Sequence, residues 1–140
     1  MPTAPLITLI KLQKTRVDEQ RLHLEKLQAR LEEIEKEIME LEIKKAREQI
    51  VAEQNAESRA TYGAFVKAAV KKGRQLEKDR NVAAAAVDVA RDRLTELFEE
   101  QKRYEIAHQA RLDAEAAEER RRERIELDEI GGVTHQRNTK

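Results

Sequence analysis

The side chains best suited to chemistry are three histidines and 28 acidic residues, in a chain of 140 residues. His23, His108 and His135 are far apart in the sequence, and none belongs to a zinc-binding pattern such as H-E-x-x-H. The chain has no cysteine, which excludes disulfides and thiolate metal sites. We expect no metal and no cofactor. His108 is interpreted as a core histidine on a helix interface, and the other two as solvent-facing.

Nucleotide binding and acid–base catalysis are not predicted either. A phosphate-binding loop needs clustered glycines between a strand and a helix, whereas the adjacent pair here is Gly131-Gly132. A carboxylate needs a desolvating pocket before its pKa suits proton transfer. The chain is 40% charged and 3% aromatic, so it has little apolar material for a pocket. We therefore expect no catalytic residue and no enzymatic activity.

One run of basic residues has two possible interpretations. The segment Glu118-Glu119-Arg120-Arg121-Arg122-Glu123-Arg124 is either a patch for nucleic acid or membrane, or a salt-bridged helix face in solvent. The interleaved glutamates and the lack of aromatic residues favour the helix face. Because 28 basic residues balance 28 acidic ones, no net field attracts polyanions, and no nucleic acid partner is expected.

The elements that must position these side chains are long helices, since the chain is rich in the strong helix formers Ala, Leu, Glu, Lys, Arg and Gln. In the first half, apolar residues recur in alternating steps of three and four, which is typical of a coiled-coil seam. They are Leu24, Leu27, Leu31, Ile34, Ile38 and Leu41, and the same phase runs back through Gln20, Val17, Gln13, Ile10 and Leu6. Beyond Leu41, the residues Ala46, Ile50 and Val51 indicate a shift of phase.

A second, weaker stripe of the same spacing follows. It comprises Ala83, Val87, Ala90, Leu94, Leu97, Gln101, Tyr104, His108 and Leu112. Between the stripes, Gly63 and Gly73 mark a break, and Gly131-Gly132 are predicted to end the second helix, as glycine after a helix often does. If Leu41 lies opposite Leu94, antiparallel pairing places Leu24 near Leu112.

The predicted fold class is all-α, with two long helices forming an antiparallel coiled-coil hairpin as a single domain over residues 1–140. Helix one covers about residues 5–57, the apex 58–73, helix two 74–130, and residues 131–140 form a tail. No apolar run reaches the roughly 18 to 20 residues that span a bilayer, and no basic leader of a signal peptide is present. We expect a soluble, cytoplasmic protein.

Both ends of the hairpin carry apolar residues that one seam cannot cover. At the apex, the cluster Phe65 to Val70 either packs on the helix pair or offers a docking surface to another protein. At the amino end, Leu6, Ile7, Leu9, Ile10 and Leu12 exceed what one seam can hide, so this end is predicted to insert into a partner.

Three short motifs carry a resemblance that covers nearly the whole chain. They are Leu6-x-x-Leu9-Ile10, Tyr62-x-x-Phe65-Val66 and Glu126-Leu127-Asp128-Glu129-Ile130. On these motifs the sequence resembles the FliJ family, the small coiled-coil components of the bacterial flagellar type III export apparatus and its virulence-system relatives. The resemblance implies a helical hairpin similar to the central shaft of rotary ATPases, with no active site of its own.

The resemblance further implies three partners: the hexameric flagellar export ATPase, the membrane export gate and the export chaperones. The paired termini would insert into the ATPase ring, the apex would face the gate, and the protein would escort unloaded chaperones. This places the protein in the cytoplasm at the inner face of the membrane, at the flagellar base, with membrane association through its partners. By position, the residues assigned to the ATPase end are Leu6, Ile10, Arg124, Leu127 and Asp128, and those assigned to the gate end are Phe65, Val66 and Ala69.

Two alternatives remain. The chain would be a structural scaffold or peripheral-stalk subunit, unrelated to export, if its seam dimerised instead of folding back. A membrane-surface helix would need a basic polar face, and acidic residues are mixed throughout the sequence.

Overall fold

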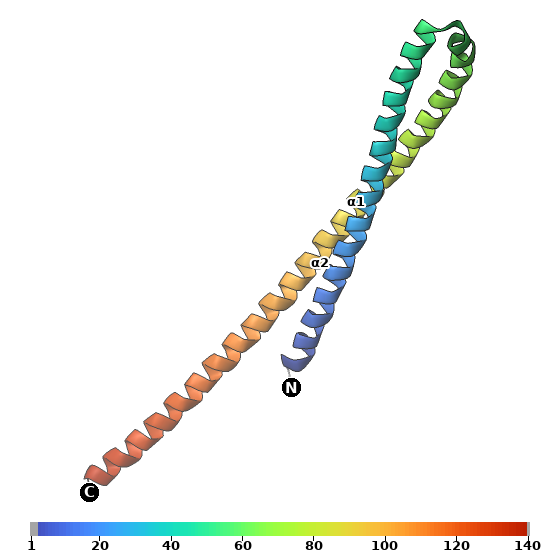
Figure 1. Ribbon diagram of the computed structural model, residues 1–140. Coiled ribbons are helices and arrows are strands. Elements are labelled where there is room, and N and C mark those ends of the chain that lie inside the picture. The colour runs from blue at the N-terminus through green and yellow to red at the C-terminus, as the bar shows by residue number, and fades with distance from the viewer. Residues whose placement is uncertain (1–2, 140) are drawn as a thin grey trace. The chain divides into compact units, whose positions relative to one another are not determined.

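The computed structural model describes residues 3–139, and this part of the chain forms two helices and no strand (Figure 1). They are α1 (Thr3–Gln54) and α2 (Ala56–Thr139). The two long helices pack against each other, which confirms the predicted all-α hairpin. No helix in the described part is long and apolar enough to cross a membrane.

The described residues divide into two units. The hairpin unit comprises residues 17–96, with the second half of α1 and the first part of α2. The terminal unit comprises residues 3–16 together with 97–139. Within the hairpin unit the chain reverses direction between α1 and α2, so the two helix segments lie antiparallel (Figure 1).

The seam of α1 lies where the three-and-four spacing predicts it. In the hairpin unit, Leu24, Ile34 and Leu41 are buried, and Leu27, Leu31 and Ile38 between them are partly buried. Two clusters form the core there. Ile34 and Leu41 pack with Ala69 and Leu76, and Leu24 packs with Val87 and Ala90.

The predicted change of phase after Leu41 is wrong. Lys45 is half-buried and Ala52 is buried, so the seam keeps its original phase as far as Ala52, although Glu48 between them is exposed. Ala46, Ile50 and Val51 are exposed. The sequence pattern predicts the phase wrongly because the small Ala52 and the charged Lys45 are not typical core residues. A lysine can nevertheless bury its aliphatic stem while its ammonium stays in water.

The chain reverses at Asn55, and residues 58–73 are part of α2 instead of forming an apex loop. The Asn55 side-chain Oδ1 accepts a hydrogen bond from the Glu57 backbone N–H at 2.8 Å, and its carbonyl accepts one from the Arg59 N–H at 3.1 Å. Asn55 is therefore the N-cap of α2. Gly63 and Gly73 do not break the helix, because no glycine in the described residues takes a positive φ.

The position of the reversal sets the pairing register of the hairpin unit. Leu41 shares its cluster with Ala69, and Leu24 shares its cluster with Val87. The residues of each pair are almost equally distant in sequence from Asn55. The predicted pairings of Leu41 with Leu94 and of Leu24 with Leu112 are therefore wrong, since they assumed a reversal in the middle of 58–73.

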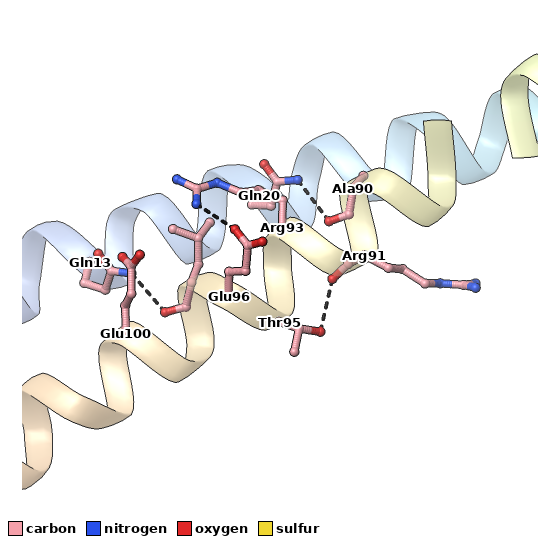
Figure 2. Close-up of polar contacts among 9 residues, drawn as sticks. Gln13, Gln20, Ala90, Arg91, Arg93, Thr95, Glu96 and Glu100 are labelled. Carbon is pink, nitrogen blue, oxygen red and sulfur yellow. Dashed lines mark hydrogen bonds and ion pairs between the residues drawn. The ribbon is translucent and has the colours of Figure 1, made fainter. Parts of the chain in front are cut away.

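Polar seam residues support the same register (Figure 2). In the hairpin unit, the Gln20 amide Nε2 donates to the Ala90 carbonyl at 3.1 Å. In the terminal unit, the Gln13 Nε2 donates to the Leu97 carbonyl at 2.9 Å and to the Glu100 Oε2 at 3.1 Å. A helical carbonyl already bonded within its helix keeps a second lone pair, which these amides use. Both glutamines thus bond the backbone of α2 directly.

The terminal unit contains a long part of α2 that α1 does not accompany. Between residues 109 and 135 every residue is exposed except the half-buried Glu118. The predicted helix end at Gly131-Gly132 is wrong, because α2 continues to Thr139. Neither glycine adopts the left-handed conformation of a C-cap. In the terminal unit, α2 therefore extends past the start of α1 (Figure 1).

The cap at Asn55 gives a first prediction. Asn55→Ala removes the side-chain acceptor and is expected to lower the free energy of unfolding by about 1 kcal/mol. Asn55→Asp keeps an acceptor in the same place and should retain most of the stability. Urea denaturation followed by circular dichroism measures both. Equal losses in the two variants would contradict the capping role.

The register gives a second prediction, which the lack of native cysteine makes easy to test. His23 and Val89 line the same groove of the hairpin unit, so spin labels on cysteines at these positions should be close. A control pair at His23 and Lys67 should be about 30 Å farther apart along the axis, at 1.5 Å per residue. Double electron–electron resonance gives both distances. A longer distance for the His23 and Val89 pair than for the control pair would exclude this register.

Candidate partner-binding surfaces

The amino end of α1 places the predicted residues Leu6 and Ile10 on the seam. Both are half-buried, and both lie in the terminal unit. The hydrogen bonds of Gln13 to Leu97 and Glu100 place Leu6, by the same antiparallel register, level with Tyr104. Their neighbours Ile7, Leu9 and Leu12 are exposed, as the excess of apolar residues at this end predicts.

The other predicted residues of the ATPase end lie elsewhere in the terminal unit. Arg124, Leu127 and Asp128 are exposed on the unaccompanied part of α2. Leu127 is 23 residues beyond Tyr104 along one helix, or about 35 Å at 1.5 Å per residue. The structure thus does not bring Leu6 and Ile10 together with Arg124, Leu127 and Asp128. The expected pairing of the two termini depended on the register that the structure corrects.

The basic run on the same part of α2 is salt-bridged along the helix face. Arg121 Nη2 lies 2.9 Å from Glu118 Oε1, and Arg122 Nε lies 3.5 Å from the same oxygen. The hydrogen bond and charge of Arg121 lower the pKa of Glu118 below its ordinary 4.5. The stabilisation from this pair is therefore complete above pH 4.5 and is lost as the pH falls through the lowered pKa. Since these groups lie at the surface of one helix, their effect is on the local helix.

The predicted gate residues lie along α2 in the hairpin unit, well after the reversal at Asn55. Phe65 is half-buried: its ring stacks on Tyr62 with centroids 6.3 Å apart, and the Lys44 Nζ lies 5.7 Å from its centroid. Val66 is exposed, whereas Ala69 is 4% exposed and belongs to the core. Of the three, Val66 is the exposed residue, and Ala69 supports the helix pair.

A surface that the sequence interpretation missed runs along α1 in the hairpin unit. Met39, Ile43, Ala46 and Ile50 follow one another in steps of four, three and four, and all four are exposed. Their heptad spacing puts them on one face of α1, away from the seam residues Ile38, Leu41 and Ala52. We name this face the α1 stripe. The sequence contains this signal, since Ala46 and Ile50 are two of the residues that indicate a shift of the seam, whereas they belong to an outer face of the helix.

The histidines and carboxylates form no ligand set in the part of the chain that the structure describes. Among residues 3–139, no group of three or more His, Cys, Asp or Glu side chains is placed to hold a metal ion. His108 is half-buried on the seam, and His23 and His135 are exposed, as the spacing predicts. The surfaces described above are apolar and charged helix faces.

Comparison with known protein families gives a match. The family model described as "Flagellar FliJ protein" matches residues 2–140. The chain belongs to the flagellar FliJ family. No curated protein and no solved structure matches it. FliJ membership confirms the resemblance drawn from the motifs and identifies the chain as a coiled-coil protein related to flagellar export.

The α1 stripe gives a third prediction, on stability. Ile43→Asp places a charge on an exposed face and should change the free energy of unfolding by no more than about 0.5 kcal/mol. Ile34→Asp buries a charge in the seam and should destabilise the hairpin by several kcal/mol. Thermal unfolding followed by circular dichroism compares the two. A large loss for Ile43→Asp would show that the stripe is part of the core.

Proposed function

We propose that this protein is a non-enzymatic stalk of the flagellar export ATPase ring, which couples the ring to the export gate and escorts export chaperones. In this proposal it acts in the cytoplasm at the flagellar base, beside the inner face of the membrane. Family membership supports the setting in flagellar export. Long exposed helix faces without a metal-ligand group in residues 3–139 support a role through protein contacts.

The observation that carries the proposal is the unaccompanied part of α2. Over residues 109–135 the helix has no buried residue, yet it presents exposed Ile125, Leu127, Ile130 and Val133. A single helix is about 10 to 12 Å across with its side chains, so it enters a narrower opening than a helix pair does. We therefore assign ring insertion to this part of α2, with Arg124, Leu127 and Asp128 as contacts. Leu6 and Ile10 would contact the ring only at its entrance.

The α1 stripe is the surface we assign to the chaperones. Four exposed apolar residues at heptad spacing match the way in which an amphipathic helix of a partner packs. Because the stripe is on the face of α1 away from the seam, a chaperone can bind there without opening the hairpin. Val66 is the residue we assign to gate contact, with Phe65 and Ala69 supporting its helix.

The alternative function, a structural scaffold outside export, would use the α1 stripe as a dimer interface. Two copies of the chain could cover their stripes by packing against each other. Light scattering distinguishes the two functions, since a scaffold of this kind is a stable dimer without any other partner.

The stalk proposal gives a fourth prediction. Leu127→Asp with Ile130→Asp adds two charges to the proposed inserting helix, and we expect at least a tenfold weaker affinity for the export ATPase with loss of ATPase stimulation. A matched control is Val82→Asp with Val89→Asp, which makes the same change at exposed residues of α2 in the hairpin unit. Titration calorimetry and phosphate release measure the two effects. Equal affinities of the two double variants would rule out insertion through this part of α2.

A further inference from the structure

One stretch of α2 departs from the charge balance of the chain. From Ser58 to Leu76 there are five basic residues and no acidic one: Arg59, Lys67, Lys71, Lys72 and Arg74. The whole chain has 28 basic and 28 acidic residues, so the rest of it carries an excess of acids. We name this stretch the cationic segment. It lies entirely within the hairpin unit, directly after the reversal at Asn55.

All five cations of this segment are exposed and form no salt bridge among residues 3–139. Elsewhere on both helices arginines pair with acids three residues away, as Arg30 does with Glu33 and Arg93 with Glu96. The cationic segment has no such acids of its own. On α1, Glu37 and Glu40 line a groove with Lys72, and Glu42 lines one with Arg74. No acidic residue lines the groove that holds Lys67 and Lys71, so the positive field is least compensated there.

Apolar side chains lie beside these charges. Tyr62, Val66 and Val70 line an open groove whose other side carries Lys67, Lys71 and Arg74. Val66 is 36% exposed and Val70 is 40% exposed. The exposed face of this part of α2 is therefore amphipathic, because a narrow strip of apolar side chains lies beside the cations. This is the pattern of a helix that lies in a membrane interface, with its cations at the level of the head groups.

We propose that the cationic segment of α2 binds directly to an anionic phospholipid membrane surface. Each Lys or Arg near such a surface contributes about 1 kcal/mol of attraction, and four to eight clustered cations are typical of helices that bind anionic lipids. Tyr62, Val66 and Val70 add a shallow apolar contact below the head groups. The earlier objection, that acidic residues are mixed throughout the sequence, does not hold for this segment.

The placement of the cations favours a lipid surface over an acidic protein. Lys67, Lys71 and Arg74 line the groove, whereas Arg59 and Lys72 lie outside it. Mobile lipid head groups can rearrange around the cations of the groove without a fixed geometry. A folded acidic partner would have to place a carboxylate against each of them. Cations spread along the helix beside a narrow apolar strip therefore match a fluid anionic surface better than a folded acidic protein.

The proposal goes beyond the stalk function and does not depend on it, because its test uses only the purified chain and lipid vesicles. Co-sedimentation with vesicles of phosphatidylcholine and phosphatidylglycerol should show binding that weakens as salt is added. Vesicles of phosphatidylcholine alone should bind little. Equal binding to both kinds of vesicle, or no binding to either, would overturn the proposal.

Charge-neutralising variants locate the site. Lys67→Gln with Lys71→Gln should lower the vesicle partition coefficient about 30-fold, at about 1 kcal/mol for each cation. The matched control is Lys11→Gln with Lys14→Gln, which removes two exposed cations from α1. It should lower binding only slightly. Equal losses in both pairs would mean that net charge alone matters and would overturn the assignment to this segment.

A tryptophan probe tests the orientation, since the chain has no native tryptophan. Val66→Trp should show a blue-shifted emission with anionic vesicles and quenching by brominated lipid, whereas Val89→Trp should show neither. Polyglutamate serves as the acidic-protein probe. If the chain bound polyglutamate through Lys67 and Lys71 but failed to bind anionic vesicles, the segment would recognise acidic protein and the lipid proposal would be wrong.

Discussion

The fold depends on where the chain reverses. Asn55 is the residue between α1 and α2 that is not helical, and its side chain caps the second helix through the Glu57 N–H. Once the reversal is fixed there, antiparallel pairing leaves little freedom, because each seam residue of α1 must meet a residue equally far beyond Asn55. The unequal helices also follow from it. With 52 residues in α1 and 84 in α2, the surplus of α2 cannot find a partner within the chain.

Within the hairpin unit, the two helices contribute side chains of different size to the seam. Leu24, Ile34 and Leu41 come from α1, whereas α2 contributes Leu76 and Val87 together with the small Ala69 and Ala90. Gly73 continues this trend, since a Cβ added to it would lie 3.6 Å from the Leu41 side chain. Small residues on α2 allow the helices to approach closely enough for the leucines of α1 to be covered. Each buried aliphatic side chain contributes about 1.5 to 3 kcal/mol, and the alanines much less, so α1 contributes the larger share where its residues face Ala69 and Ala90, while Leu76 and Val87 contribute from α2.

This asymmetry explains what could and could not be predicted from the sequence. The α1 seam was predictable from Leu24 to Leu41, and also back through Gln20 and Gln13, because its apolar residues are large and regular. The seam of α2 was predictable only from Ala83 onward, since its earlier positions include Gly73 and Arg80, both of which are half-buried.

The reversal was missed for a related reason. Gly63 and Gly73 were expected to break the helix, although a helix can retain glycine at a cost of about 1 kcal/mol against alanine. Asn55 followed by an acidic residue in the first turn of α2 is a typical helix start. The error in the turn then carried through to the register, and the register determined which candidate residues appeared to meet.

The polar seam residues show how the register is held once the reversal has set it. Gln13 is 1% exposed, and its Oε1 has no hydrogen-bond partner while its Nε2 has two. A buried acceptor without a partner costs about 1 to 3 kcal/mol, so Gln13 is a poorer residue for stability than leucine. A leucine, however, would fit several registers almost equally well. An amide must find a carbonyl at hydrogen-bond distance while the apolar residues on either side keep their own partners. Gln13 therefore selects one alignment at a cost in stability, as buried polar residues do in other coiled coils.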